Sequence, residues 1–107
     1  MNGAQRLTCL MEQTGADERL RPVHVALIVA LCHLWMKNSF NKWYPISRKR
    51  LMGLSRIHSN ATYHKVINEL QYYGYLHYHP SYHPGNGSRV RIVIPSRNQI
   101  EPTYVNE

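Results

Sequence analysis

The chain has 107 residues, of which 43% are hydrophobic, and this is enough for one compact domain with its own core. Its N-terminus has no basic segment followed by an apolar stretch, and its longest apolar run, residues 23–36, is too short to span a bilayer. We therefore expect a soluble cytoplasmic protein and not a secreted or membrane-spanning one.

Positive charge is concentrated in the middle of the chain. The formal net charge is +7, yet between residues 19 and 100 a single acid, Glu69, stands beside twelve lysines and arginines. A field of one sign opposes compaction, and an anionic partner would relieve the repulsion. The alternative is a basic surface that is merely solvated.

The first 21 residues are polar and of mixed charge. Leu7, Leu10 and Met11 are spaced like one face of a short helix. We interpret residues 1–21 as an N-terminal extension that can form a helix.

The first core helix is predicted from Pro22 to about Lys37, because proline at the first helical position costs no hydrogen bond. One face of this helix carries Val23, Leu27, Ala30, Leu31 and Leu34. The opposite face is also apolar, through Val25, Ile28, Val29 and Cys32. Such a helix has to be covered on both sides, by the extension or by a second subunit. We favour a homodimer, because the extension has few large apolar residues.

A short strand and two helices are predicted next. Residues 43–46 are typical of an edge strand, where Pro45 is tolerated. Ser47 is an N-cap candidate for a helix over about residues 48–55. After a tight turn, Ser59 caps a helix that runs to about Tyr73, and Gly74 ends it in a left-handed conformation.

The rest of the domain is predicted to be a β-hairpin. Leu76 and Tyr78 alternate with histidines, and apolar residues at 90, 92 and 94 alternate with arginines. The connection contains Asn86-Gly87, a pair that accepts positive φ, and Pro95 ends the second strand. The domain is therefore expected over residues 22–95, with a C-terminal tail over residues 96–107.

This order of elements resembles the winged helix-turn-helix of bacterial regulators. The resemblance rests on Ile46-Ser47-Arg48-Lys49-Arg50-Leu51, Leu54-Ser55-Arg56-Ile57, Ser59-Asn60-Ala61-Thr62-Tyr63-His64-Lys65-Val66-Ile67-Asn68-Glu69-Leu70 and Gly74-Tyr75-Leu76. Segments 61–65 and 80–84, with Gly87-Ser88, are also similar to short winged-helix proteins of conjugative and mobilisable elements. The sequence departs from the pattern at Arg56, where glycine is frequent, and at His58, which is one extra residue.

The resemblance implies an α+β fold: a three-helix core, a C-terminal β-hairpin wing and an extra N-terminal segment. It also implies sequence-specific binding of double-stranded DNA, as in a small transcriptional regulator. The alternative is an accessory protein for replication, excision or conjugation that acts through DNA architecture or protein contacts. These two roles differ in how strongly binding responds to salt.

The third core helix carries the predicted base-reading residues. Its positions 63, 66, 67 and 70 are apolar at helical spacing and are expected to face the core. The remaining surface presents side chains that can hydrogen-bond base edges or touch a thymine methyl group. These residues are Asn60, Ala61, Thr62, His64, Lys65 and Asn68.

A second set of residues is predicted to contact phosphates. Three cations occupy the first turn of the helix at 48–55, where the helix dipole disfavours them, and a phosphate would remove the conflict. The predicted phosphate contacts are Lys42, Arg48, Lys49, Arg50, Arg56, His58 and Ser59. The predicted wing contacts are His83, Asn86, Arg89 and Arg91.

Metal binding and catalysis are weaker hypotheses. His77, His79 and His83 invite a zinc site, but no cysteine or carboxylate lies near them in the sequence to complete four ligands. The chain has no glycine-rich phosphate loop and no nucleophile beside a base. We therefore expect no enzyme activity, no cofactor, no metal and no small-molecule ligand.

Overall fold

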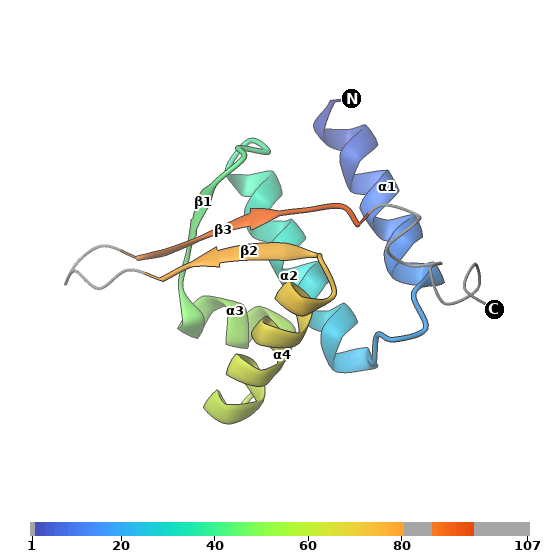
Figure 1. Cartoon of the computed structure of the whole chain (residues 1–107). Helices are drawn as coiled ribbons and strands as arrows, with labels where there is room; N and C mark the ends of the chain where they lie inside the picture. The colour runs from blue at the N-terminus through green and yellow to red at the C-terminus, as the bar shows by residue number, and fades with distance from the viewer. Residues whose placement is uncertain (1, 81–86, 96–107) are drawn as a thin grey trace.

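The protein is an α+β fold in which helices pack against one face of a small sheet (Figure 1). A computed structural model describes residues 2–80 and 87–95. In this part of the chain the elements are α1 (Gly3–Ala16), α2 (Pro22–Lys37), β1 (Tyr44–Ile46), α3 (Arg48–Ser55), α4 (Asn60–Tyr72), β2 (Leu76–His79) and β3 (Ser88–Ile92). The sheet is antiparallel with the strand order β1-β3-β2.

The N-terminal segment forms a helix that belongs to the core. Asn2 caps α1: its side chain accepts a hydrogen bond from the Gln5 amide, and its own amide donates to the Gln5 side chain. Leu10 is completely buried. At the start of the helix, a Cβ on Gly3 would lie 2.3 Å from the Phe40 ring. Residues 3–16 are therefore packed closely onto the rest of the chain.

Helix α2 has the predicted bounds, with Pro22 at its start, and it is the central helix of the fold. The chain itself buries Ile28 and Cys32, whereas Val25 and Val29 remain 37% and 52% exposed. The expectation that another subunit covers this whole face is therefore too broad. Only a narrow stripe of α2 remains uncovered.

A buried histidine joins α2 to α4. His24 Nδ1 accepts a hydrogen bond from the Arg21 amide at 2.9 Å, and His24 Nε2 lies 3.0 Å from a carboxylate oxygen of Glu69. Because Nδ1 accepts, the proton of the neutral ring is on Nε2, which donates to Glu69. The acid that interrupts the basic region of the sequence is thus used to hold two helices together.

The strands agree with the sequence pattern except at their ends. β1 is an edge strand and tolerates Pro45, as expected, but it begins at Tyr44. β3 ends at Ile92, before the predicted stop at Pro95: the Val93 amide still donates to the Tyr75 carbonyl in the register of β2, but the next position of the partner is Gly74, where the chain turns with φ 91°. The pairing of β1 with β3 makes the hairpin part of a three-stranded sheet.

Local signals fix the bounds of α3 and α4. The Ser47 side chain accepts a hydrogen bond from the Arg50 amide, and the Ser59 side chain accepts one from the Thr62 amide. α3 ends at Arg56, which is left-handed with φ 63°, and Gly74 follows α4 with φ 91°. Arg56 therefore adopts the conformation for which glycine is usual at such a turn.

The connection between α1 and α2 is tied to the start of β2. The buried Asp17 carboxylate accepts two hydrogen bonds from the Arg19 guanidinium, at 2.9 and 2.7 Å, and one from the Tyr75 hydroxyl at 2.8 Å. Burial raises the pKa of Asp17, but the hydrogen bonds from Arg19 and Tyr75 outweigh it and leave the pKa below its ordinary value.

None of the helices in the described part of the chain has the length and hydropathy that a membrane-spanning helix needs.

Candidate nucleic-acid interface

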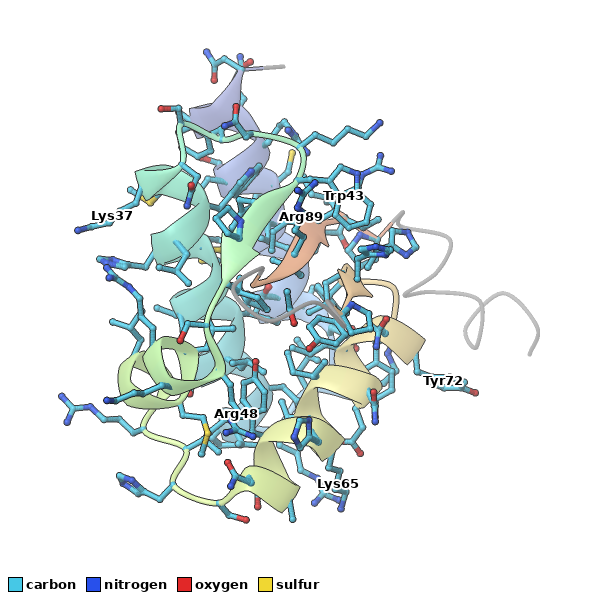
Figure 2. The ribbon with its side chains drawn as sticks, turned by 90° about the vertical axis from the view of Figure 1, so that its left-hand side faces the viewer. Lys37, Trp43, Arg48, Lys65, Tyr72 and Arg89 are labelled. Atoms are coloured by element: carbon cyan, nitrogen blue, oxygen red, sulfur yellow. The ribbon has the colours of Figure 1, made fainter. Side chains whose placement is uncertain are left out.

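Helix α4 turns a polar face to solvent. Tyr63, Val66, Ile67 and Leu70 are buried, as predicted from their spacing. All six predicted base-reading residues, Asn60, Ala61, Thr62, His64, Lys65 and Asn68, are exposed. Figure 2 shows Lys65 projecting from the outer side of α4. The structure therefore brings this predicted set together on one continuous surface.

One further residue of this surface was not predicted from the sequence. Tyr72 follows Asn68 by one helical turn, and it is 87% exposed. The predicted base-reading residues end at Asn68 and do not include it. Its spacing of four from Asn68 and seven from Lys65 was the signal that could have placed it on the outer face.

The first turn of α3 is cationic and exposed. Arg48, Lys49 and Arg50 are all exposed, and no acidic residue occupies that turn. The backbone amides of a helix N-terminus and these cations attract an anion together. The site thus combines two adjacent sources of positive potential.

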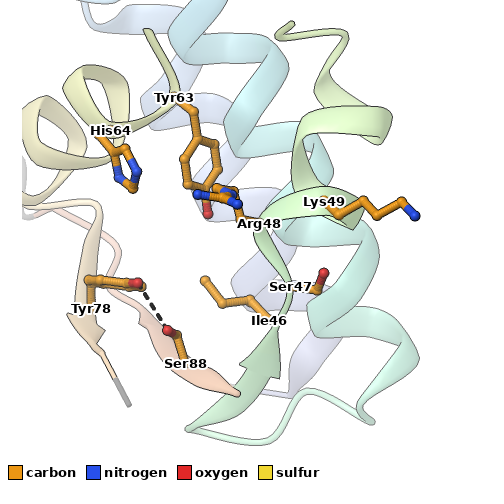
Figure 3. Close-up of a pocket in the computed structure, with 8 residues that line it drawn as sticks. All are labelled: Ile46, Ser47, Arg48, Lys49, Tyr63, His64, Tyr78 and Ser88. Atoms are coloured by element: carbon orange, nitrogen blue, oxygen red, sulfur yellow. Dashed lines mark hydrogen bonds between the residues drawn. The ribbon is translucent and has the colours of Figure 1, made fainter. Parts of the chain in front are cut away.

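A cleft joins α3, α4 and the hairpin (Figure 3). Its volume is about 390 Å³, and it is lined by Ile46, Ser47, Arg48, Lys49, Tyr63, His64, Tyr78 and Ser88. On one side, the Arg48 guanidinium lies beside the hydroxyl end of Tyr63. On the other side, the hydroxyls of Tyr78 and Ser88 are 3.0 Å apart and hydrogen-bonded. Every wall therefore carries a polar group.

The Tyr63 phenol is neutral at physiological pH. Burial raises its pKa to about 12, and the positive charge of Arg48 opposes this shift only in part. A neutral hydroxyl beside an arginine adds no negative charge to the cleft. The cleft consequently keeps the net positive character that Arg48 and Lys49 give it.

The remaining predicted phosphate contacts divide into two groups. Arg56, His58 and Ser59 are exposed in the turn between α3 and α4 and so continue the α3 surface. Lys42 is exposed as well, but it precedes β1, whereas α3 follows the other end of that strand. The structure does not bring Lys42 to the cleft, because the length of β1 separates them.

The predicted wing residues are not on the surface formed by α4. Val90 and Ile92 are buried on the helix-facing side of β3. Since side chains alternate along a strand, Arg89 and Arg91 lie on the opposite face of the sheet, away from the helices. His83 and Asn86 fall outside the described residues.

The described residues include no group of three or more His, Cys, Asp or Glu side chains that could hold a metal ion. His77 and His79 are on the outer face of the sheet, and His83 lies outside the described part of the chain. Comparison with protein families, with curated proteins and with solved structures found no match for this chain.

Proposed function

We propose that the protein binds double-stranded DNA, with α4 in the major groove, and that it acts as a small transcriptional regulator with a winged-helix fold. The observation that carries the proposal is the exposed polar face of α4 beside the cationic first turn of α3. The two surfaces meet at the cleft, so that one ligand can contact both.

The dimensions of α4 suit a major groove. An α-helix with its side chains is about 10–12 Å in diameter, and the major groove is about 12 Å wide. Asn68 can pair with adenine through two hydrogen bonds, Lys65 can donate to guanine, and Ala61 can touch a thymine methyl group. The residue types on this face therefore match the chemistry of base edges.

The α3 side would hold the DNA backbone. Arg48 and Lys49 line the cleft together with His64, which comes from α4. Phosphate contacts of this kind fix the orientation of a protein on the duplex, and base contacts then read the sequence. A backbone phosphate in the cleft would also neutralise the cations that the α3 dipole disfavours.

The direct test is binding to a duplex sequence selected from a random library. We expect Lys65→Ala to weaken binding at least tenfold and to reduce the log–log salt slope by about 0.9 if Lys65 contacts a phosphate. Asn68→Ala should weaken binding to the selected duplex more than to a scrambled one, because it removes a base contact.

Lys37→Ala is the matched control, because Lys37 is exposed at the end of α2, away from α4 (Figure 2). It should change affinity by less than twofold. The proposal would be contradicted if the random library yielded no enriched duplex sequence. It would also be contradicted if neither Lys65→Ala nor Asn68→Ala altered tight binding to the duplex.

A further inference from the structure

The outer face of the sheet is a second cationic surface. The strand registers place His77 opposite Arg91 and His79 opposite Arg89, and they place Pro45 opposite Arg89 from the other side. Trp43 precedes β1 and carries its ring over this face, edge-on to His79 at 6.4 Å between ring centroids. Two arginines, two histidines and an indole are thus gathered on the face opposite the helices.

The charges of this face are not compensated within the described part of the chain. In that part of the chain, Asp17 pairs with Arg19, and Glu69 accepts a hydrogen bond from His24; neither acid contacts Arg89 or Arg91. A stable sheet would be expected to place an acid opposite Arg89 or Arg91, because opposite charges across strands are favourable. Histidines stand opposite both arginines instead, so the face is complementary to an anion.

The indole adds a second kind of contact. The chain has two tryptophans. Trp35 is completely buried and packs against Phe40, whereas Trp43 is 41% exposed. Trp43 and Arg89 are both labelled in Figure 2, and His79 joins them: it contacts the Trp43 ring and is the strand partner of Arg89. An exposed aromatic ring among arginines is the combination on which single-stranded nucleic acids bind, with bases on the ring and phosphates on the cations.

We propose that this outer face binds single-stranded nucleic acid, with one base stacked on Trp43 and the backbone along Arg89 and Arg91. A duplex fits less well, because its bases are already stacked on one another and are not free to cover an indole. Arg89 and Arg91 are two residues apart on one strand, or about 7 Å, a separation comparable to one nucleotide of an extended chain.

This surface is separate from the one proposed for duplex DNA. It shares no residue with the outward face of α4 or with the cleft. A protein with both surfaces can hold a duplex and a single strand at the same time. The inference goes beyond duplex binding and does not depend on it.

The test uses the full chain and two labelled probes: an oligothymidylate and the duplex selected as above. Tryptophan emission should be quenched by the oligothymidylate, because a base covers Trp43. In Trp43→Phe, the remaining emission comes from the buried Trp35 and should not change on addition of the probe. Trp43→Ala should weaken oligothymidylate binding tenfold or more.

A second set of variants in this binding test removes the two arginine charges. The double substitution Arg89→Gln with Arg91→Gln should reduce the salt slope for oligothymidylate by about 1.4 and leave duplex affinity within twofold. Lys37→Gln is the matched control for loss of an exposed cation and should affect neither probe. Circular dichroism of each variant checks that the fold is kept.

The outer-face proposal and the duplex proposal are contradicted by different results. If oligothymidylate does not bind, or if it binds equally well to Trp43→Ala and to the double arginine variant, the outer-face proposal is wrong. If Lys65→Ala and Asn68→Ala alone remove oligothymidylate binding, α4 takes the single strand and the proposal is again wrong. If oligothymidylate binds as expected and duplex does not, the duplex proposal fails and this one stands.

Discussion

Arg56 holds a backbone conformation that costs energy for every residue with a Cβ. Its φ of 63° closes α3, and its amide donates to the Met52 carbonyl. Glycine would adopt the same conformation with little strain. An exposed arginine at this position, next to the first turn of α4, is consistent with a role on the surface that we propose for duplex DNA.

Arg56→Gly should therefore raise the free energy of unfolding by about 1 kcal/mol, because the left-handed strain is removed. The same substitution should weaken duplex binding several-fold, because a phosphate contact is lost. Thermal unfolding and fluorescence anisotropy measure the two effects. A less stable variant, or one with unchanged affinity, would show that Arg56 serves the fold.

At the same scale, most members of the α4 surface were predictable from the sequence, because a helix fixes the direction of each side chain by its position. The spacing of Tyr63, Val66 and Leu70 alone placed Lys65 and Asn68 outside. Lys42 and Arg89 could not be placed in this way. Their positions depend on which way a strand runs and on which face of the sheet the helices cover.

Among the elements, α3 shows the clearest conflict between stability and charge. Its first turn carries Arg48, Lys49 and Arg50 at the positive end of the helix dipole. Each cation there costs a few tenths to about 1 kcal/mol. Two other local features of α3, its serine cap and the buried Leu51, favour the helix.

Lys49→Glu should increase the melting temperature slightly, because it places a negative charge at the helix N-terminus. Duplex affinity should fall by more than tenfold, because a phosphate would meet an anion in the cleft. The neutral variant Lys49→Gln should lie between the wild type and Lys49→Glu in both melting temperature and duplex affinity. An unchanged duplex affinity in Lys49→Glu would place the phosphate elsewhere.

Helices α2, α3 and α4 were predicted to within one or two residues because their ends are set by neighbours in sequence, whereas no bounds were predicted for α1 within residues 1–21. Pro22, Ser47, Ser59 and Gly74 act within one turn of where they stand. The end of β3 was predicted less well. Its pairing ends where the partner chain turns at Gly74, the position that would face Ile94, and the sequence of β3 itself does not show where its partner begins.

At the scale of the whole molecule, Asp17 links the N-terminal helix to the sheet. Its carboxylate is bound by Arg19 and Tyr75, so the pKa is lowered in the folded protein. A carboxyl group with a lowered folded-state pKa contributes stability above its unfolded pKa. That contribution is lost as the pH falls through the folded value.

Asp17→Asn should consequently lower the free energy of unfolding by about 1–3 kcal/mol at pH 7. The difference from wild type should begin to shrink below about pH 4, the ordinary range of an aspartate, and should vanish as the pH falls through the lower pKa of the folded Asp17. Chemical denaturation at several pH values measures this. Glu18→Gln, an exposed neighbouring acid, is the control and should show neither effect. A pH-independent difference would contradict this role for the charge.

The uncovered stripe of α2 concerns the assembly of the molecule. Val25, Val29 and Met36 lie on one side of the helix and are 37%, 52% and 51% exposed. We propose that two chains pair through this stripe. Sedimentation at micromolar concentration should give twice the 12.6 kDa mass of one chain. Val29→Glu should halve that mass; a wild-type mass of 12.6 kDa would refute the dimer.

Local patterns were enough to predict helices α2 to α4, the strand alternation and the outward face of α4, because caps, turns and periodicity act between residues close in the chain. The folded structure was needed to show that α1 joins the core, that Glu69 bonds His24, and that the arginines of β3 face away from α4. These features depend on pairs far apart in sequence. Such pairs are selected by the packing of the whole chain, which no local pattern contains.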